Sequence, residues 1–173
     1  MMSTATTILQ GYFTLARNWF EGTMQGVTPE LAHWQPPGKT QPIGANYIHV
    51  LTTEDFLING IVRGGAPLMA SGFAGKSGFS EPPPPGNRDE WAQRVRVDLD
   101  AARAYAQAVY ASTSAYLDTA TDEDLSRIVD MSAVGFGDQP VSFLIGLLLL
   151  NIHNHCGEIS AIKGMNGLQG YPG

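Results

Sequence analysis

The sequence predicts an all-α fold, a bundle of four long helices in a single domain that spans residues 1–173. Three observations predict it. Apolar residues recur at helical spacing in four long segments, strand-like alternation is scarce, and segments rich in Gly and Pro separate the periodic ones. Helices of this kind bury their apolar stripes against one another, which a four-helix bundle achieves.

The first helix is predicted over about residues 3–22, with Ser3 or Thr4 as its cap. Four large side chains follow one another at steps of four, three and four residues, which places them on one face. We expect that face, and the tryptophans of the chain, to be in the core. The four are Ile8, Tyr12, Leu15 and Trp19.

The second helix is predicted from about Pro42 to Arg63, with Gly64-Gly65 as its end. A short helical turn precedes it, because Thr28 is a good N-cap and Pro29 suits the first helical position. Residues 70–87 then form a long loop rich in Pro, Gly and Ser, which is either a plain connector or a lid.

The third helix is predicted to begin at Asn87, with Glu90 in a capping-box position, and to run for about 30 residues as bundle helices do. Residues 128–137 favour an extended segment or hairpin. The fourth helix opens after Asp138-Gln139-Pro140 and closes at Gly164 or Gly167.

Composition narrows the class of protein. The net charge is −6 and the ten Lys and Arg residues are scattered, whereas a nucleic-acid-binding face needs clustered basic residues, so we expect no nucleic-acid partner. The single cysteine, Cys156, suits a cytoplasmic protein. The apolar run Val141–Leu150 has half of the roughly 20 residues that a membrane span needs. We therefore expect a buried helix and no membrane partner.

Polar side chains interrupt the fourth helix directly after that apolar run. Asn151, His155 and Glu158 are four and three residues apart and share one face, and Asn154 flanks them. His153 lies about 200° around the helix from His155, so both imidazoles cannot serve one ion. Buried polar groups need a bonding partner. The stripe therefore predicts a metal site, a substrate pocket or a subunit contact.

The chain resembles the DinB/YfiT superfamily of bacterial helical-bundle proteins over nearly its whole length. The residues that carry the resemblance are the opening helix, the Thr28-Pro29-Glu30-Leu31 turn, His49 within Ala45–Leu51, the segment 151–159 and the ending Gly167–Pro172. The late motif of that family reads His-x-x-x-His followed by Arg-Gly-Gln or Arg-Gly-Glu. Here His155-Cys156-Gly157-Glu158 is similar to its second half.

The resemblance implies a DinB-like four-helix bundle and a divalent metal, zinc or nickel, bound by three side chains. Carried over by position, the ligands are His49, Asn151 and His155, with Asn154 and Glu158 around them. Asn151 stands where the family has histidine, and Cys156 where it has arginine. The resemblance also implies a thiol-dependent S-transferase or isomerase that uses a low-molecular-weight thiol, and a homodimer.

Two functions remain open at this point. One is a metal-dependent enzyme in which the ion activates a thiol. The other is a non-catalytic protein that binds a small molecule or another protein on the same bundle, with a degenerate metal site, because a carboxamide is a poorer zinc or nickel ligand than an imidazole.

Overall fold

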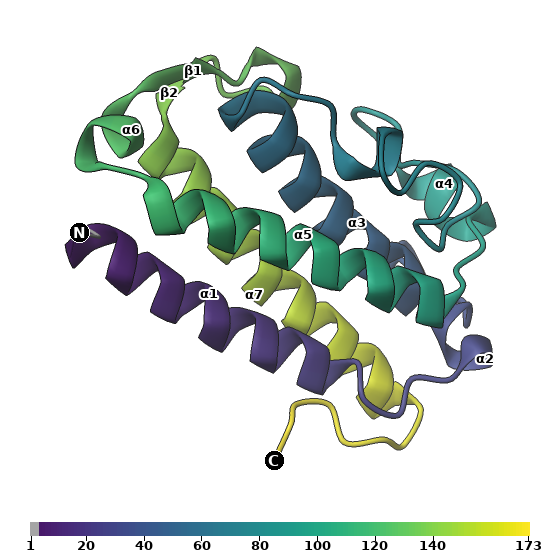
Figure 1. Cartoon of the computed structure of the whole chain (residues 1–173). Helices are drawn as coiled ribbons and strands as arrows, with labels where there is room; N and C mark the ends of the chain where they lie inside the picture. Colours follow the sequence, from purple (N-terminus) through teal and green to yellow (C-terminus); the bar gives the residue numbers. More distant parts are fainter. Residues whose placement is uncertain (1–3) are drawn as a thin grey trace.

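A computed structural model describes residues 4–173, and it is an all-α bundle as predicted (Figure 1). Four long helices form the body, and short helices and a two-stranded hairpin fill their connections. The elements are α1 Thr4–Thr23, α2 Pro29–Ala32, α3 Ile43–Asp55, η1 Phe56–Val62, η2 Leu68–Ala70, α4 Asp89–Arg94, α5 Leu99–Thr119, α6 Asp122–Ser126, β1 Ile128–Asp130, η3 Ser132–Val134, β2 Asp138–Pro140 and α7 Val141–Met165.

The helices follow an up-down-down-up order. In Figure 1, α1 and α7 run in one direction and α3 and α5 in the other. The ends of α1 and α7 meet, because Nζ of Lys163 donates to the carbonyl oxygens of Thr23 and Gln25 at 2.8 Å each. Since α3 and α5 are parallel neighbours, the chain between them must travel the length of the bundle. That need explains the long connection of residues 63–98.

The connection between α3 and α5 is firmly attached to the bundle. The Asp55 carboxylate accepts hydrogen bonds from the backbone N–H groups of Leu68 and Met69, at 2.8 and 2.9 Å. Further on, the backbone of Phe79 pairs with that of Val97. Gly78 has a φ of +79°, and a Cβ there would lie 2.3 Å from the backbone nitrogen of Ala102 in α5. Only glycine therefore allows this approach.

The first helix buries the opposite side from the predicted one. Ile8, Tyr12, Leu15 and Trp19 are 53%, 56%, 56% and 42% exposed, so the expectation that they form the core is wrong. A second stripe faces inward instead, and it contains Leu9, Phe13, Ala16, Arg17 and Phe20. Ser3, one of the two expected caps, lies outside the described residues.

Two predicted helices are divided in the structure. The second keeps its bounds, but its last turns, η1, have π-helical hydrogen bonding. The third is not continuous from Asn87: α4 ends at Arg94, and α5 begins anew at Leu99. Asp98 caps α5, because its carboxylate accepts from the backbone N–H groups of Asp100 and Ala101. Trp91 of α4 is buried as expected, whereas Trp34 is only half-buried.

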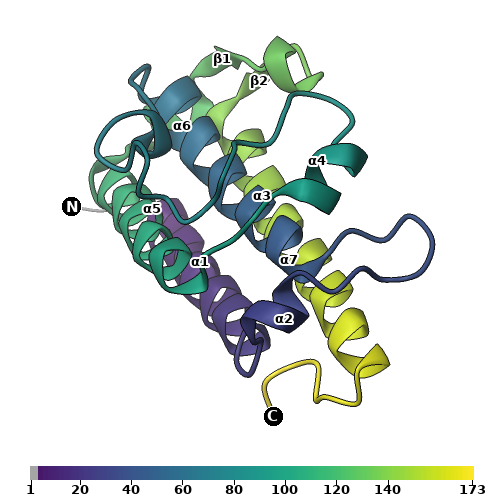
Figure 2. The ribbon, with the colours of Figure 1, turned by 90° about the vertical axis from the view of Figure 1, so that its right-hand side faces the viewer.

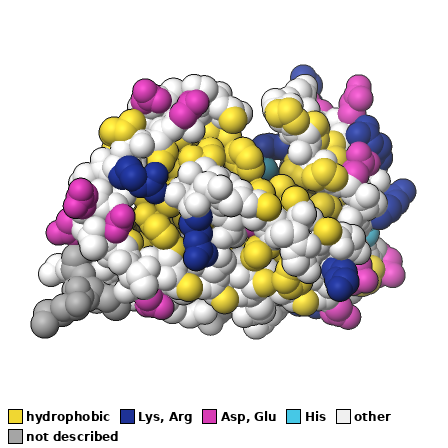
Figure 3. Space-filling view, turned by 45° about the horizontal axis from the view of Figure 1, so that its top comes forward, with side chains coloured by type: hydrophobic (Ala, Val, Ile, Leu, Met, Phe, Trp, Pro, Cys, Tyr) yellow, Lys and Arg dark blue, Asp and Glu magenta, His cyan; other side chains and the backbone are white. Residues whose placement is uncertain are grey.

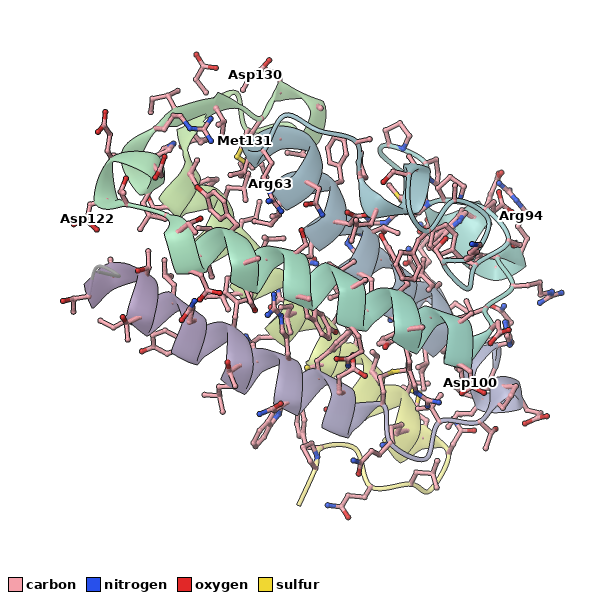
Figure 4. The ribbon with its side chains drawn as sticks, viewed as in Figure 1. Arg63, Arg94, Asp100, Asp122, Asp130 and Met131 are labelled. Atoms are coloured by element: carbon pink, nitrogen blue, oxygen red, sulfur yellow. The ribbon has the colours of Figure 1, made fainter. Side chains whose placement is uncertain are left out.

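The predicted hairpin closes one end of the bundle. Strands β1 and β2 are antiparallel, and Val129 pairs with Gln139 in their register. Met131 is fully buried and points inward beneath the hairpin, while Asp130 points away from the body (Figure 4). Figure 4 also shows Arg94, from α4, at the opposite end of the molecule from Asp122 of α6.

A buried ion pair joins the long helices. Arg17 of α1 pairs with Glu54 of α3, whose carboxylate also accepts a hydrogen bond from Thr113 of α5 at 2.6 Å. The Arg17 guanidinium lies 4.7 Å from the ring centroids of both Phe13 and Tyr110, so it is held by cation–π contacts on two sides. Three helices are thereby fixed to one another by polar contacts inside the core.

Charge and apolar surface are unevenly distributed. On the face shown in Figure 3, acidic side chains lie mainly around the rim and hydrophobic ones across the middle, with a notch in the upper edge. Within residues 4–173 no helix is both long enough and apolar enough to span a bilayer.

Candidate functional site

The two histidines singled out on separate helices meet in the structure. His49, in the middle of α3, and His155, in the second half of α7, place their ring centroids 4.9 Å apart with the planes at 80°. One imidazole edge thus faces the other ring. The meeting of these two residues follows from the bundle, because α3 and α7 are adjacent and pack antiparallel. The pairing that the resemblance implies is therefore present.

Each imidazole is oriented through its Nδ1 atom. Nδ1 of His155 lies 2.7 Å from Oε2 of Glu158, one turn further along α7. Nδ1 of His49 lies 3.2 Å from the Thr53 hydroxyl oxygen, one turn further along α3. A carboxylate only accepts hydrogen bonds, so Nδ1 of His155 carries a proton and donates it to Glu158. This arrangement is typical of histidines that bind metal ions through Nε2.

The protonation of His49 suits ligand binding. Burial, the positive charge of Arg88 and the neighbouring His155 together lower the pKa of His49 to about 3, so its imidazole is neutral at physiological pH. The hydrogen bond from His155 is the main reason that the pKa of Glu158 lies below its ordinary value. Glu158 is therefore an ionised carboxylate that holds the imidazole of His155 in place.

Asn151 completes the group from α7. Its side chain forms a hydrogen bond with His49, which makes it a neighbour of both imidazoles. Its amide nitrogen Nδ2 is buried and has no hydrogen-bond partner within residues 4–173. The remaining predicted residue, Asn154, is exposed.

The other two histidines lie elsewhere. His153 is exposed, and its Nδ1 bonds to the carbonyl oxygen of Leu149 at 2.8 Å. It does not share a site with His155, in agreement with the geometry of the helix. His33 joins two segments: its Nδ1 lies 2.7 Å from the carbonyl oxygen of Pro29, and its Nε2 accepts the backbone N–H of Val97 at 2.9 Å. It is a structural residue.

A cavity of about 450 Å³ opens beside the two histidines. It is lined by Lys39, Thr40, Gln41, Asn46, Arg88, His155 and Glu158. Figure 2 shows the α2–α3 connection and α4 on one side of α3 and α7. The lining residues come from that connection, from α3 and α7, and from Arg88 just before α4. Sequence reasoning missed Lys39, Asn46 and Arg88. Lys39 and Arg88 lie in connections, where periodicity carries no information on placement. Asn46 offered a signal, because it lies one helical turn before His49.

Cys156 is not a reactive thiol in this structure. It is 2% exposed, and burial is the main cause that raises its pKa to about 11. A thiol with so high a pKa is almost wholly protonated at physiological pH and is a poor nucleophile.

The donor set fits a divalent ion only in part. Two imidazoles and one carboxamide meet here, and zinc and nickel favour imidazole. Within residues 4–173, no group of three or more His, Cys, Asp and Glu side chains is placed to hold a metal ion. An ion at this position would have two imidazole ligands, and an amide oxygen and water would have to supply the rest.

Comparisons with known proteins agree with this architecture. The family model described as the DinB superfamily matches residues 12–159. A conserved protein from Enterococcus faecalis, known from its crystal structure, has the same fold: the TM-score is 0.78 at 20% identity, over 94% of this chain and 96% of the other. A search among curated proteins found no significant match. With a family match over most of its length, the chain belongs to the DinB superfamily.

Proposed function

We propose that this protein binds a divalent metal ion, zinc or nickel, through His49 and His155, with Asn151 beside them. The observation that carries the proposal is the contact between the two imidazoles, each oriented through Nδ1 by an oxygen atom. Pre-oriented imidazoles lose little conformational entropy when they bind an ion.

The activity that this site would support is the transfer of a chemical group from, or to, a small thiol. When bound, the ion supplies Lewis acidity, which lowers the pKa of a thiol at an open coordination position. Residues of the chain would orient the imidazoles and make room for the substrates. Glu158 keeps the Nδ1 proton on His155, Thr53 positions the ring of His49, and the cavity of about 450 Å³ has room for a small thiol and its partner.

Metal binding can be tested with two matched variants of α7. His155→Ala removes one proposed ligand, whereas His153→Ala removes an exposed imidazole two residues away. Zinc titration of chelator-treated protein should give one equivalent bound for the wild type and for His153→Ala, and a strong loss for His155→Ala. Binding that is equal in all three proteins, or absent from the wild type, would disprove the metal proposal.

A second function uses the same pocket without a metal. The buried Nδ2 of Asn151 has no partner in the described part of the chain, and it is an N–H donor that suits a polar ligand better than a cation. The protein would then bind a small molecule without turning it over. Binding of such a molecule by zinc-free protein, with no thiol transfer after zinc is added, would favour this function.

We also propose that two copies of the chain associate through the outer face of α1. All ten exposed residues of this 20-residue helix are uncharged, and they include Ile8, Tyr12, Leu15 and Trp19. The adjacent α7 adds Phe143 and Leu150, which are 39% and 56% exposed. An uncharged, apolar surface of this length is rare on a monomer and common at a subunit interface.

A further inference from the structure

Unpartnered polar atoms gather around the two histidines. Six buried side-chain nitrogen or oxygen atoms of the described residues have no hydrogen-bond partner, and three of them belong to Asn46, Arg88 and Asn151. Asn46 and Arg88 line the cavity, and Asn151 bonds to His49 beside it. A buried polar atom without a partner costs about 1–3 kcal/mol. Two such residues in the walls of one cavity, with a third next to it, point to a polar ligand there.

The charge around the cavity indicates the sign of that ligand. Its walls carry two cations, Lys39 and Arg88, and one carboxylate, Glu158, which is already bonded to His155. Arg88 is half-buried, its Nε atom is unpartnered, and it has no ion pair within residues 4–173. Burial lowers the pKa of Arg88, while the charge of Glu158 raises it. A guanidinium remains protonated under these conditions and attracts an anion.

Asn46 narrows the class of anion further. It is 1% exposed, and its Oδ1 atom faces no donor among residues 4–173. Its own amide group donates to the carbonyl oxygen of Gln41, so Oδ1 is the atom left for a ligand. An acceptor next to a guanidinium suits a molecule with a hydroxyl, amine or thiol close to its negative group. The dianion of a phosphate monoester has no such donor.

We propose that Arg88 binds the carboxylate of a small acid in this cavity, and that Asn46 accepts a hydrogen bond from a hydroxyl, amino or thiol group near that carboxylate. The inference rests on the proposed function, because it names the class of molecule that the His49–His155 site receives. The planar guanidinium donates two parallel N–H groups, which match the two oxygens of a carboxylate. The two imidazoles lie beside this ligand.

The acid and the metal ion should assist each other's binding. The positive charge of Arg88 acts on His49, and it opposes a divalent cation at the same place. A carboxylate bound to Arg88 removes most of that opposition. Coupling between two ligands is reciprocal, so zinc should bind more tightly in the presence of the acid, and the acid more tightly in the presence of zinc.

Glycolate is a suitable probe, because it has one carboxylate and one hydroxyl. We would titrate it calorimetrically into chelator-treated protein and compare the wild type with Arg88→Gln and Arg96→Gln. Arg96 is exposed and lies outside the cavity lining, so its variant makes the same charge change. Arg88→Gln should weaken binding by about tenfold or more, because a hydrogen-bonded charge pair is worth about 1.5–3 kcal/mol. Arg96→Gln should leave it within about twofold.

Three results would overturn the inference. They are no saturable glycolate binding by the wild type, equal weakening by Arg88→Gln and Arg96→Gln, and binding of methyl phosphate that is as tight as that of glycolate. Unfolding curves of both variants would show that the fold is retained. If the fold of Arg88→Gln is damaged, Arg88→Lys provides the test, because it keeps the charge but loses the paired donors and should also weaken binding.

The same samples separate this inference from the metal proposal. Zinc titrations would be made with and without glycolate. If glycolate binds through Arg88 but zinc does not bind, the metal proposal fails and the acid-binding site stands. If zinc binds through His155 but glycolate does not bind, only the present inference fails.

Discussion

His155 donates its Nδ1 proton to Glu158 at 2.7 Å, one turn further along the same helix. This contact fixes which nitrogen of the imidazole faces the cavity.

We predict that Glu158→Gln, which keeps an acceptor but removes the charge, lowers zinc affinity by about ten- to a hundredfold. This is the range found when a hydrogen-bond partner of a metal-binding histidine is changed. Zinc titration with a competing chelator measures it. The control is Glu123→Gln, an equal charge change on the exposed surface of α6; a similar loss in both variants would contradict the prediction.

The buried ion pair of Arg17 and Glu54 predicts an asymmetric effect on stability. Arg17→Met removes the charge but keeps a side chain between Phe13 and Tyr110, and it leaves Glu54 with its Thr113 hydrogen bond alone. An uncompensated buried charge costs about 3–5 kcal/mol. The double variant Arg17→Met with Glu54→Gln should recover much of this loss. Urea unfolding of the three proteins measures the difference, and additive losses would show that the pair is not coupled.

Glu21 predicts a pH dependence of stability. Burial is the main cause that raises the pKa of Glu21 above its ordinary value of 4.5, although the phenol groups of Tyr110 and Tyr47 donate hydrogen bonds to it. The folded protein therefore holds this proton more tightly than the unfolded chain does. The resulting stabilisation is complete below the unfolded pKa and is lost as the pH rises through the folded pKa.

Glu21→Gln cannot ionise, so the variant should gain stability relative to the wild type as the pH rises from the ordinary value of 4.5 through the raised pKa of Glu21 in the folded protein. The difference between the two unfolding free energies isolates this group from the other carboxylates. A difference that does not change over that range, or that moves in the opposite direction, would refute the assignment.

The uncharged outer face of α1 predicts self-association. Leu15→Glu places a charge in the middle of that face, where a leucine is 56% exposed, so it should leave the fold intact within about 0.5 kcal/mol. Sedimentation equilibrium should show a dimer for the wild type and a monomer for the variant. Gln107→Glu on the exposed side of α5 serves as the charge control and should remain dimeric. A monomeric wild type would remove the proposed interface.

The sequence was informative where regular structure decides the position of a residue. His49 and His155 could be paired from sequence because both lie on long helices and a family resemblance placed those helices side by side. The hairpin and the cap at Thr28 were also correct, since both depend on local turn chemistry.

Elsewhere local patterns were ambiguous. The first helix has two apolar stripes, and the stripe chosen from the spacing of Ile8, Tyr12, Leu15 and Trp19 is the exposed one. The true core face contains Arg17, a residue that normally argues against burial. Similarly, the apolar spacing continues across the break between α4 and α5, so it predicted one helix. The signal for the break is Asp98, which caps α5. Arg88 was missed because no local pattern places a residue of a long connection next to a helix distant in sequence.

The route of the chain between α3 and α5 bears on how the ligand selectivity of this protein can change in evolution. The histidines belong to the helices, whereas Arg88 belongs to the segment that crosses from one parallel helix to the next. Insertions and substitutions are tolerated better in such segments than in packed helices. Selectivity for a ligand could therefore diverge among relatives by exchange of this crossing segment, while the pair of imidazoles and the bundle that carries it stay the same.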